Sequence, residues 1–210
     1  MTTQIGEPAG ESSERRVAVE SAAVIGDPGG LGLAGFAATT MVLSVFNAGL
    51  LPTSFEKVVL PLALFYGGLA QLLAGMWEFR KGNGFGGTAF TSYGAFWMSF
   101  AAYVQFVVPA LGGTSAAAPA TGLYLTAWAV FTGYMLIASM RTNTAIMAVF
   151  LLLFVTYVLL AIAEFGSVSG LAVIGGYVGL ATALAAWYAS AAIVTNATWG
   201  EVVMPVGPRA

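Results

Sequence analysis

The sequence predicts an all-α fold, a polytopic membrane bundle of six transmembrane helices. The chain has 210 residues, of which 59% are hydrophobic and 8% are charged, whereas roughly a quarter of the residues of a soluble domain are charged. Asp, Glu, Lys and Arg are all absent from residues 82–140, 142–163 and 165–200. Because so few charges cannot cover a surface that faces water, these long uncharged runs favour a chain solvated by lipid.

Six apolar segments have the length needed to cross a bilayer, which is roughly 20 residues for about 30 Å of hydrocarbon. Residues typical of turns separate them: Pro52, the polar stretch 78–84, the pair Gly112-Gly113 with Pro119, Arg141-Thr142-Asn143, and the stretch 166–170. The glycine-rich run 84–87 has no strand before it and is expected to be a loop. The predicted spans are Leu31–Leu51, Val58–Trp77, Phe90–Val108, Leu123–Met140, Ala145–Ala163 and Leu171–Val194.

The short connections predict one transmembrane domain, residues 27–200, because closely spaced helices pack together. Residues 1–26 are expected to be a polar cytoplasmic tail without fixed structure, and residues 201–210 a short cytoplasmic tail. The basic residues set the orientation. Those on one side of a six-span topology are Arg15, Arg16, Arg80, Lys81, Arg141 and Arg209, and only Lys57 lies opposite. The positive-inside rule therefore places both termini in the cytoplasm and the protein in the cytoplasmic membrane.

The composition also excludes several function classes. The net charge is −2, which does not suggest nucleic-acid binding. The chain has neither Cys nor His, so thiolate chemistry, disulfides and the commonest haem and metal ligand are missing. No Ser/His pair or phosphate-binding loop is present. We therefore predict no enzyme activity, no cofactor and no metal.

Three of the spans carry a stripe of small and polar residues on one face. Helical spacing aligns Gly32, Phe36, Thr39, Leu43 and Asn47 in the first span; Gly67, Gln71, Ala74, Gly75 and Glu78 in the second; and Thr88, Ser92, Ala95, Ser99 and Ala102 in the third. Helix packing explains any single small residue. The amides of Asn47 and Gln71 are costly against lipid, so three adjacent stripes together predict a narrow polar path.

Three carboxyl groups lie near the ends of spans. Glu78 ends the second span beside Arg80 and Lys81, and Glu164 follows the fifth. We expect both in the headgroup region, Glu78 in an ion pair, although either could load protons into a path. Asp27 precedes the first span and suits a helix N-cap.

Three segments resemble the succinate–acetate permease family, also called the acetate uptake transporters. They are the run Phe65–Met98 (FYGGLAQLLAGMWEFRKGNGFGGTAFTSYGAFWM), the segment Asp27–Leu33 (DPGGLGL), and Gly122-Leu-Tyr-Leu with Trp128 and Phe131. The second segment is similar to the family's Asn-Pro-Ala-Pro-Leu-Gly-Leu signature, from which Asp27, Gly29 and Gly30 depart. The resemblance extends from about residue 26 to Pro205.

The resemblance implies six helices, cytoplasmic termini and a hexamer in which each protomer has its own pore. It implies transport of acetate and related small monocarboxylates, with succinate as a further substrate, by a channel-like or proton-coupled route. Matching positions place a pore constriction at Phe36, Tyr93 and Leu153. The signature residues expected along the pore are Asp27, Gly30, Leu31, Gly32 and Leu33.

A carboxylate in such a pore meets no Lys or Arg, so hydroxyl, amide and backbone N–H groups must bind it. The candidate donors are Thr39, Thr40, Asn47, Gln71 and Ser92, and the candidate proton-coupling groups are Asp27, Glu78 and Glu164. Two alternatives stay open: a channel for another small neutral solute such as urea or ammonia, and a membrane sensor or assembly subunit that transports nothing.

Overall fold

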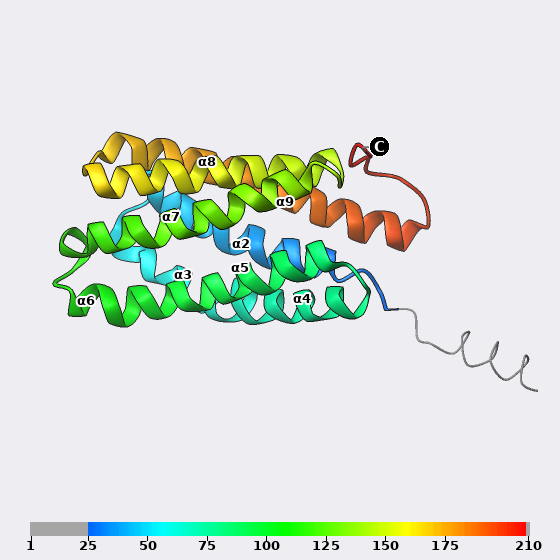
Figure 1. Ribbon diagram of the computed structural model, residues 1–210, viewed down its shortest axis with the longest axis horizontal. Coiled ribbons are helices and arrows are strands. Elements are labelled where there is room, and N and C mark those ends of the chain that lie inside the picture. The colour runs from blue at the N-terminus through cyan, green and yellow to red at the C-terminus, as the bar shows by residue number, and fades with distance from the viewer. Residues whose placement is uncertain (1–24, 209–210) are drawn as a thin grey trace, which may run out of the picture.

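The structure of the protein is a computed structural model that describes residues 25–208. Almost all of the predicted N-terminal tail therefore lies outside the described residues, as do Arg15, Arg16 and Arg209 of the charge pattern. Within 25–208 the chain forms an elongated bundle of six helical rods (Figure 1), with no β-strand in that range. The predicted all-α bundle is confirmed.

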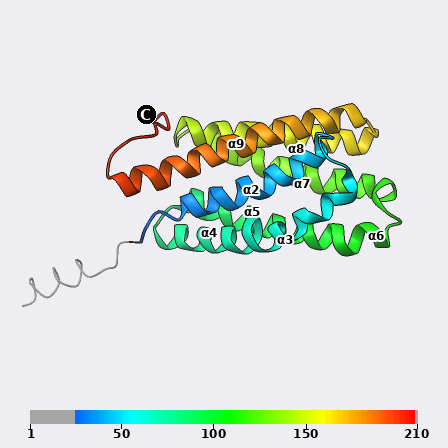
Figure 2. The same cartoon turned by 180° about the vertical axis from the view of Figure 1, so that it is seen from behind.

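The rods follow one another along the chain and alternate in direction (Figures 1 and 2). Two of them contain π-helical turns, η2 and η3, and η1 is a 3-10 helix that leads into α3. The rods are α2 (Gly29–Asn47); η1 (Thr53–Val58) with α3 (Val59–Leu64), η2 (Phe65–Ala70) and α4 (Gln71–Arg80); α5 (Gly84–Ala102) with η3 (Tyr103–Val107) and α6 (Val108–Ala110); α7 (Thr114–Ser139); α8 (Thr144–Gly166); and α9 (Ser169–Trp199).

Every rod begins before its predicted span, and the largest differences are at α5 and α7. The run 84–87, expected to be a loop, is the first turn of α5, because the Asn83 side chain accepts a hydrogen bond from Gly86 N at 3.0 Å and caps the helix. Helix α7 begins at Thr114, so Pro119 lies within its first two turns. Proline has no N–H, so the carbonyl of Ser115, four residues before it, lacks its usual helical hydrogen bond. Each of the six rods covers most of one predicted span.

Five of the rods described between residues 25 and 208 are long and apolar enough to cross a membrane. They are Gly29–Asn47, Thr53–Arg80, Thr114–Ser139, Thr144–Gly166 and Ser169–Trp199. The sixth rod, α5 with η3, is less apolar because glycine, serine and threonine alternate with its aromatic residues. Most of its aromatic residues in α5 are buried in the bundle, whereas Phe106 in η3 is exposed.

Small residues allow the helices to approach closely, as is usual in membrane bundles. A Cβ added at Gly35 of α2 would lie 2.5 Å from the carbonyl oxygen of Tyr66 in η2. At Gly176 of α9 an added Cβ would collide with the backbone at Asn47 and Ala48, where α2 ends. Helices α2 and α9 are therefore locked together along most of their length.

The segment 203–208 returns along the bundle and binds two helices. Thr144 N and Ala145 N in the first turn of α8 donate hydrogen bonds to the carbonyls of Gly207 and Val206, at 2.8 and 3.1 Å. The side chain of Asn196 on α9 binds the backbone of Val203 and Met204. These bonds satisfy N–H groups that a helix start otherwise leaves unpaired.

The start of α2, the α4–α5 turn, the α7–α8 turn and the C-terminal segment all lie at one end of the bundle (Figure 1). The α2–η1 connection, the α6–α7 turn and the α8–α9 turn lie at the other end. Below, these are called the inner end and the outer end. Arg80, Lys81 and Arg141 belong to the inner end and Lys57 to the outer end.

Candidate functional site

Three residues from three different helices are buried in the core of the bundle. Phe36 of α2, Tyr93 of α5 and Leu153 of α8 are 3%, 3% and 4% exposed and belong to one hydrophobic cluster. The ring centroids of Phe36 and Tyr93 are 5.7 Å apart. These are the three residues at which the resemblance predicts a constriction, and all three are buried in the same apolar core. We call this group the pinch.

Helix α7 also contacts Tyr93. The sequence did not predict that α7 takes part in this group. The Tyr93 hydroxyl forms a hydrogen bond of 2.9 Å with the buried hydroxyl of Thr132. The Tyr93 ring also lies 5.3 Å from Phe131 and 6.0 Å from Trp128. These three residues share one face of α7, but the sequence does not say that this face turns towards Tyr93. Their contacts fix the Tyr93 ring in one orientation.

A cavity of about 160 Å³ lies on the outer side of the pinch. Its wall includes Leu43, Phe100 and Leu160, each seven residues beyond the pinch residue on the same rod. Seven residues of α-helix rise roughly 10.5 Å, and all three rods run in the same direction. The cavity is therefore about two turns from the pinch, along the same three helices. We call it the outer vestibule.

Polar residues from five elements line the outer vestibule. Asn47 and Glu164 line it, and both are among the predicted candidates. Glu56 of η1 also lines it and was missed, because a residue in a short connection shows no helical periodicity. Tyr103 and Thr121 line the wall with their hydroxyls paired at 2.7 Å. No group of residues within 25–208 could hold a metal ion.

The ion pair expected for Glu78 is not formed with any described residue. Its side chain is 2% exposed, and its Oε2 accepts a hydrogen bond from Asn83 Nδ2 at 2.8 Å. Lys81, the expected type of partner, forms its ion pair with Asp27. Glu78 Oε1 lies against Gly29, the first residue of α2. The positive end of the α2 dipole therefore faces this carboxyl group.

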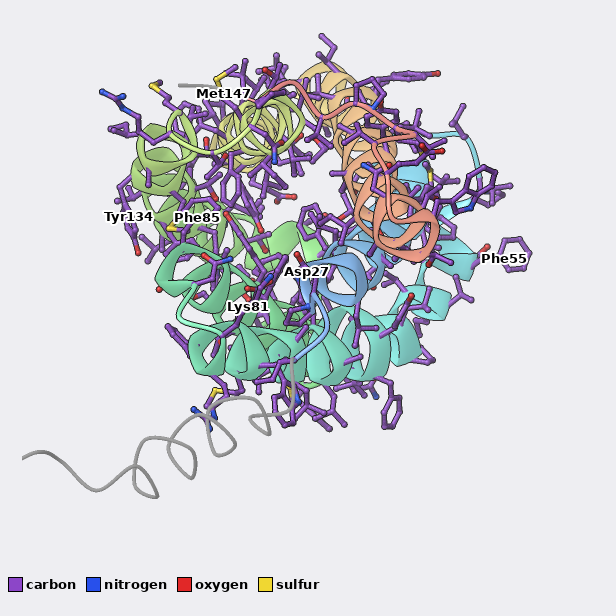
Figure 3. All side chains as sticks on the ribbon, turned by 90° about the vertical axis from the view of Figure 1, so that its right-hand side faces the viewer. Asp27, Phe55, Lys81, Phe85, Tyr134 and Met147 are labelled. Atoms are coloured by element: carbon purple, nitrogen blue, oxygen red, sulfur yellow. The ribbon has the colours of Figure 1, made fainter. Side chains whose placement is uncertain are left out.

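Asp27 binds both a cation and a helix start. Its Oδ2 lies 2.9 Å from Lys81 Nζ, and its Oδ1 accepts a hydrogen bond of 2.9 Å from Gly29 N. The N-cap position itself is Pro28, so Asp27 supports the helix start from one residue further out. Figure 3 shows Asp27 and Lys81 close together at the inner end, with Phe55 and Tyr134 at the periphery. The charge of Asp27 is thus paired.

The predicted path along three stripes is only partly reproduced. The stripes of α2 and the second rod are mostly buried and pack against each other, whereas Ala95, Ser99 and Ala102 of the third are exposed. On α5 the bulky aromatic residues occupy the inward face, since they bury more surface than the small ones. The pinch and the outer vestibule lie mainly between α2, the α5 rod, α7 and α8 instead.

The remaining candidate donors differ in availability. Thr39 Oγ1 already donates to the Gly35 carbonyl at 2.9 Å. Thr40 Oγ1 and Gln71 Oε1 are buried without a hydrogen-bond partner among the described residues. Ser92 is partly buried on α5, beside Tyr93. None of these four lines the outer vestibule.

The signature segment forms the first turn of α2. The Gly30 carbonyl accepts a bond of 2.6 Å from Ser190 Oγ on α9. Gly32 packs on the Phe90 ring. Leu33 is buried, whereas Leu31 is 47% exposed and points away from the bundle interior. Packing thus accounts for Gly30, Gly32 and Leu33, and the exposed Leu31 is not placed for a pore.

The fold and the central pinch define a helical membrane protein of the transporter and channel class. Comparison with known proteins gives the family: the chain belongs to the GPR1/FUN34/yaaH family, whose profile matches residues 10–208. This result confirms the resemblance predicted from the sequence.

Individual relatives agree with this assignment. The chain is 38% identical over 184 residues to the succinate-acetate/proton symporter SatP of Escherichia coli K12, covering 87% of this chain and 96% of that protein. It is 44% identical over 178 residues to ammonia transport outward protein 2 of Saccharomyces cerevisiae, covering 81% and 62%. The chain thus spans about six-tenths of the length of that yeast relative. A solved structure of the bacterial acetate channel SatP has a TM-score of 0.80 at 37% identity and covers 87% of this chain and 99% of its own. These relatives are named as transporters and a channel, in agreement with a protein that is not an enzyme.

Proposed function

We propose that the protein carries acetate and related small monocarboxylates across a membrane, through a path within each protomer. The proposal is supported by the burial of Phe36, Tyr93 and Leu153 in one apolar cluster, with a cavity lined by residues further along the same three rods. The names of SatP and of the acetate channel supply the substrate class.

The chemistry of the path favours a species with little charge. The described residues of the pinch and the outer vestibule include no Lys or Arg, so a bare carboxylate finds no counter-ion there. An apolar constriction also excludes hydrated ions. Moving an anion inward against a membrane potential that is negative inside costs about 2.3 kcal/mol for every 100 mV. Proton-coupled uptake or passage of the neutral acid avoids this cost.

The topology supports a cytoplasmic-membrane protein with both termini inside. Arg80, Lys81 and Arg141 gather at the inner end, and Lys57 is at the outer end, so the positive-inside rule puts the inner end in the cytoplasm. Large apolar side chains around the bundle are exposed, among them Phe106, Leu123 and Ile137, as lipid contact requires.

A hexamer is part of the same proposal. The exposed residues Ala95, Ser99 and Ala102 give α5 a flat outer face, and small residues of this kind form close helix–helix contacts in membranes. The mass of the purified protein in detergent, measured by light scattering, tests this assembly. A monomeric mass would contradict it.

The decisive experiment is flux of labelled acetate into liposomes that contain only the purified chain. We expect uptake to follow an imposed pH gradient, acid outside, and to be competed by propionate. Acetate flux that follows voltage and ignores the pH gradient would refute proton coupling. No flux above protein-free liposomes would favour a sensor or assembly subunit.

Ammonia is the second candidate cargo, because the yeast relative is named for outward ammonia transport. A small neutral solute could pass the same apolar pinch. Internal alkalinisation of dye-loaded vesicles after an ammonium pulse measures its entry. A rate that exceeds that of protein-free vesicles and is unaffected by acetate would favour ammonia.

A further inference from the structure

Two carboxyl groups face the outer vestibule from different parts of the chain. Glu56 comes from η1, which joins the first two rods, and Glu164 comes from the last turn of α8. Both side chains are partly buried, and both line the same cavity. Neither has a hydrogen bond or an ion pair with another described residue. A structural role would normally supply such partners, because burying an unpaired ionisable group is costly.

The rest of the vestibule offers nothing to neutralise them. Lys57 follows Glu56 in sequence, but its side chain is exposed and does not line the cavity. The Tyr103 hydroxyl is bound to Thr121. An ionised carboxylate can only accept hydrogen bonds, so two of them cannot bind the carboxylate of a substrate. They repel it instead.

We infer that Glu56 and Glu164 determine the specificity of the outer vestibule, admitting the uncharged monocarboxylic acid and rejecting dicarboxylates. The inference rests on the proposed function. Repulsion between two unit charges at contact distance lowers the local concentration of an anion by about fivefold, even at the dielectric constant of water. A dianion such as succinate brings two charges towards Glu56 and Glu164, whereas the acetate anion brings one, so succinate meets twice as many repulsive charge pairs. Discrimination against succinate therefore exceeds discrimination against the acetate anion.

The test compares initial rates of labelled acetate and labelled succinate at pH 7, in liposomes of the full-length protein. In the double variant Glu56→Gln with Glu164→Gln, we expect the succinate-to-acetate ratio to rise about fivefold or more. The double variant Glu56→Asp with Glu164→Asp keeps the charges and should keep the wild-type ratio. Glu201→Gln is the matched control, because Glu201 is an exposed carboxyl group at the inner end.

Lowering the external pH gives a second readout that a structural role would not change. In the wild type, the ratio should rise from pH 7 to pH 5 through protonation of the two substrates and of the vestibule. In the Gln variant only the substrates titrate, so the rise should be smaller. Single Gln variants with intermediate ratios would support the inference if the double variant does not fold. Acetate flux with an unchanged ratio in folded Gln variants would overturn this inference alone, whereas no flux of either acid in the wild type would overturn the proposed function as well.

Discussion

Replacing Phe36 by alanine should open the pinch. The side chain is 3% exposed and packs on Tyr93 with ring centroids 5.7 Å apart. A buried Phe→Ala change costs about 3–5 kcal/mol of stability, with a cavity contribution of about 24 cal/mol per Å³. If about 2 kcal/mol of this cost is cavity, the space left is roughly 80 Å³. At about 30 Å³ each, two waters fit that space.

A water in the pinch changes the transit of a carboxylic acid. It lets the carboxyl group keep one hydrogen bond that it otherwise loses in an apolar constriction, which stabilises the transit state by about 1–1.5 kcal/mol. Since 1.36 kcal/mol corresponds to a factor of ten in rate, acetate flux should rise by about fivefold to tenfold. Selectivity against larger acids such as butyrate should fall in the same variant.

The assay is stopped-flow acidification of liposomes loaded with a pH dye, at equal protein content. Phe46→Ala is the matched control, because Phe46 lies on the same helix, is 5% exposed and is outside the central cluster. Both variants should lose similar thermal stability, and only Phe36→Ala should gain flux. Wild-type rates and selectivity in a well-folded Phe36→Ala protein would show that Phe36 is not part of the gate.

Three further predictions concern the surroundings of the pinch. Tyr93→Phe leaves the buried Thr132 hydroxyl without its partner, so thermal unfolding in detergent should show a loss of about 1–3 kcal/mol; unchanged stability would contradict the role given to this bond. Asp27→Asn removes the half-exposed ion pair with Lys81 but keeps an oxygen for the helix start, so stability should fall by less than about 1 kcal/mol; a larger loss, measured in the same way, would mean that the pair does more than stabilise the surface. Gly35→Ala drives a methyl group into the backbone of η2, so the yield of monodisperse protein in gel filtration should drop sharply, and a normal yield would show that the two rods can separate.

Much of the fold could be predicted because hydropathy and charge are properties of consecutive residues. Uncharged length gave the six spans. Helix starts were misplaced both where a side chain caps the helix, as at Asn83, and where none does, as at the start of α7. The candidate site was harder to predict from the sequence than the fold. Its three central residues were found by resemblance, whereas Thr132 was missed because nothing in the sequence says which face of α7 turns towards Tyr93.

The sequence by itself determined that this chain is a six-span membrane bundle, because the cost of placing charges in hydrocarbon is paid residue by residue along the chain. Only the tertiary structure decided which polar groups meet. It paired Lys81 with Asp27 in an ion pair and placed the Asn83 amide in a hydrogen bond with the buried Glu78. It also brought Glu56 into one cavity with Glu164. These pairings depend on how each rod is rotated about its axis, and that rotation is set by packing against neighbours far away in the sequence.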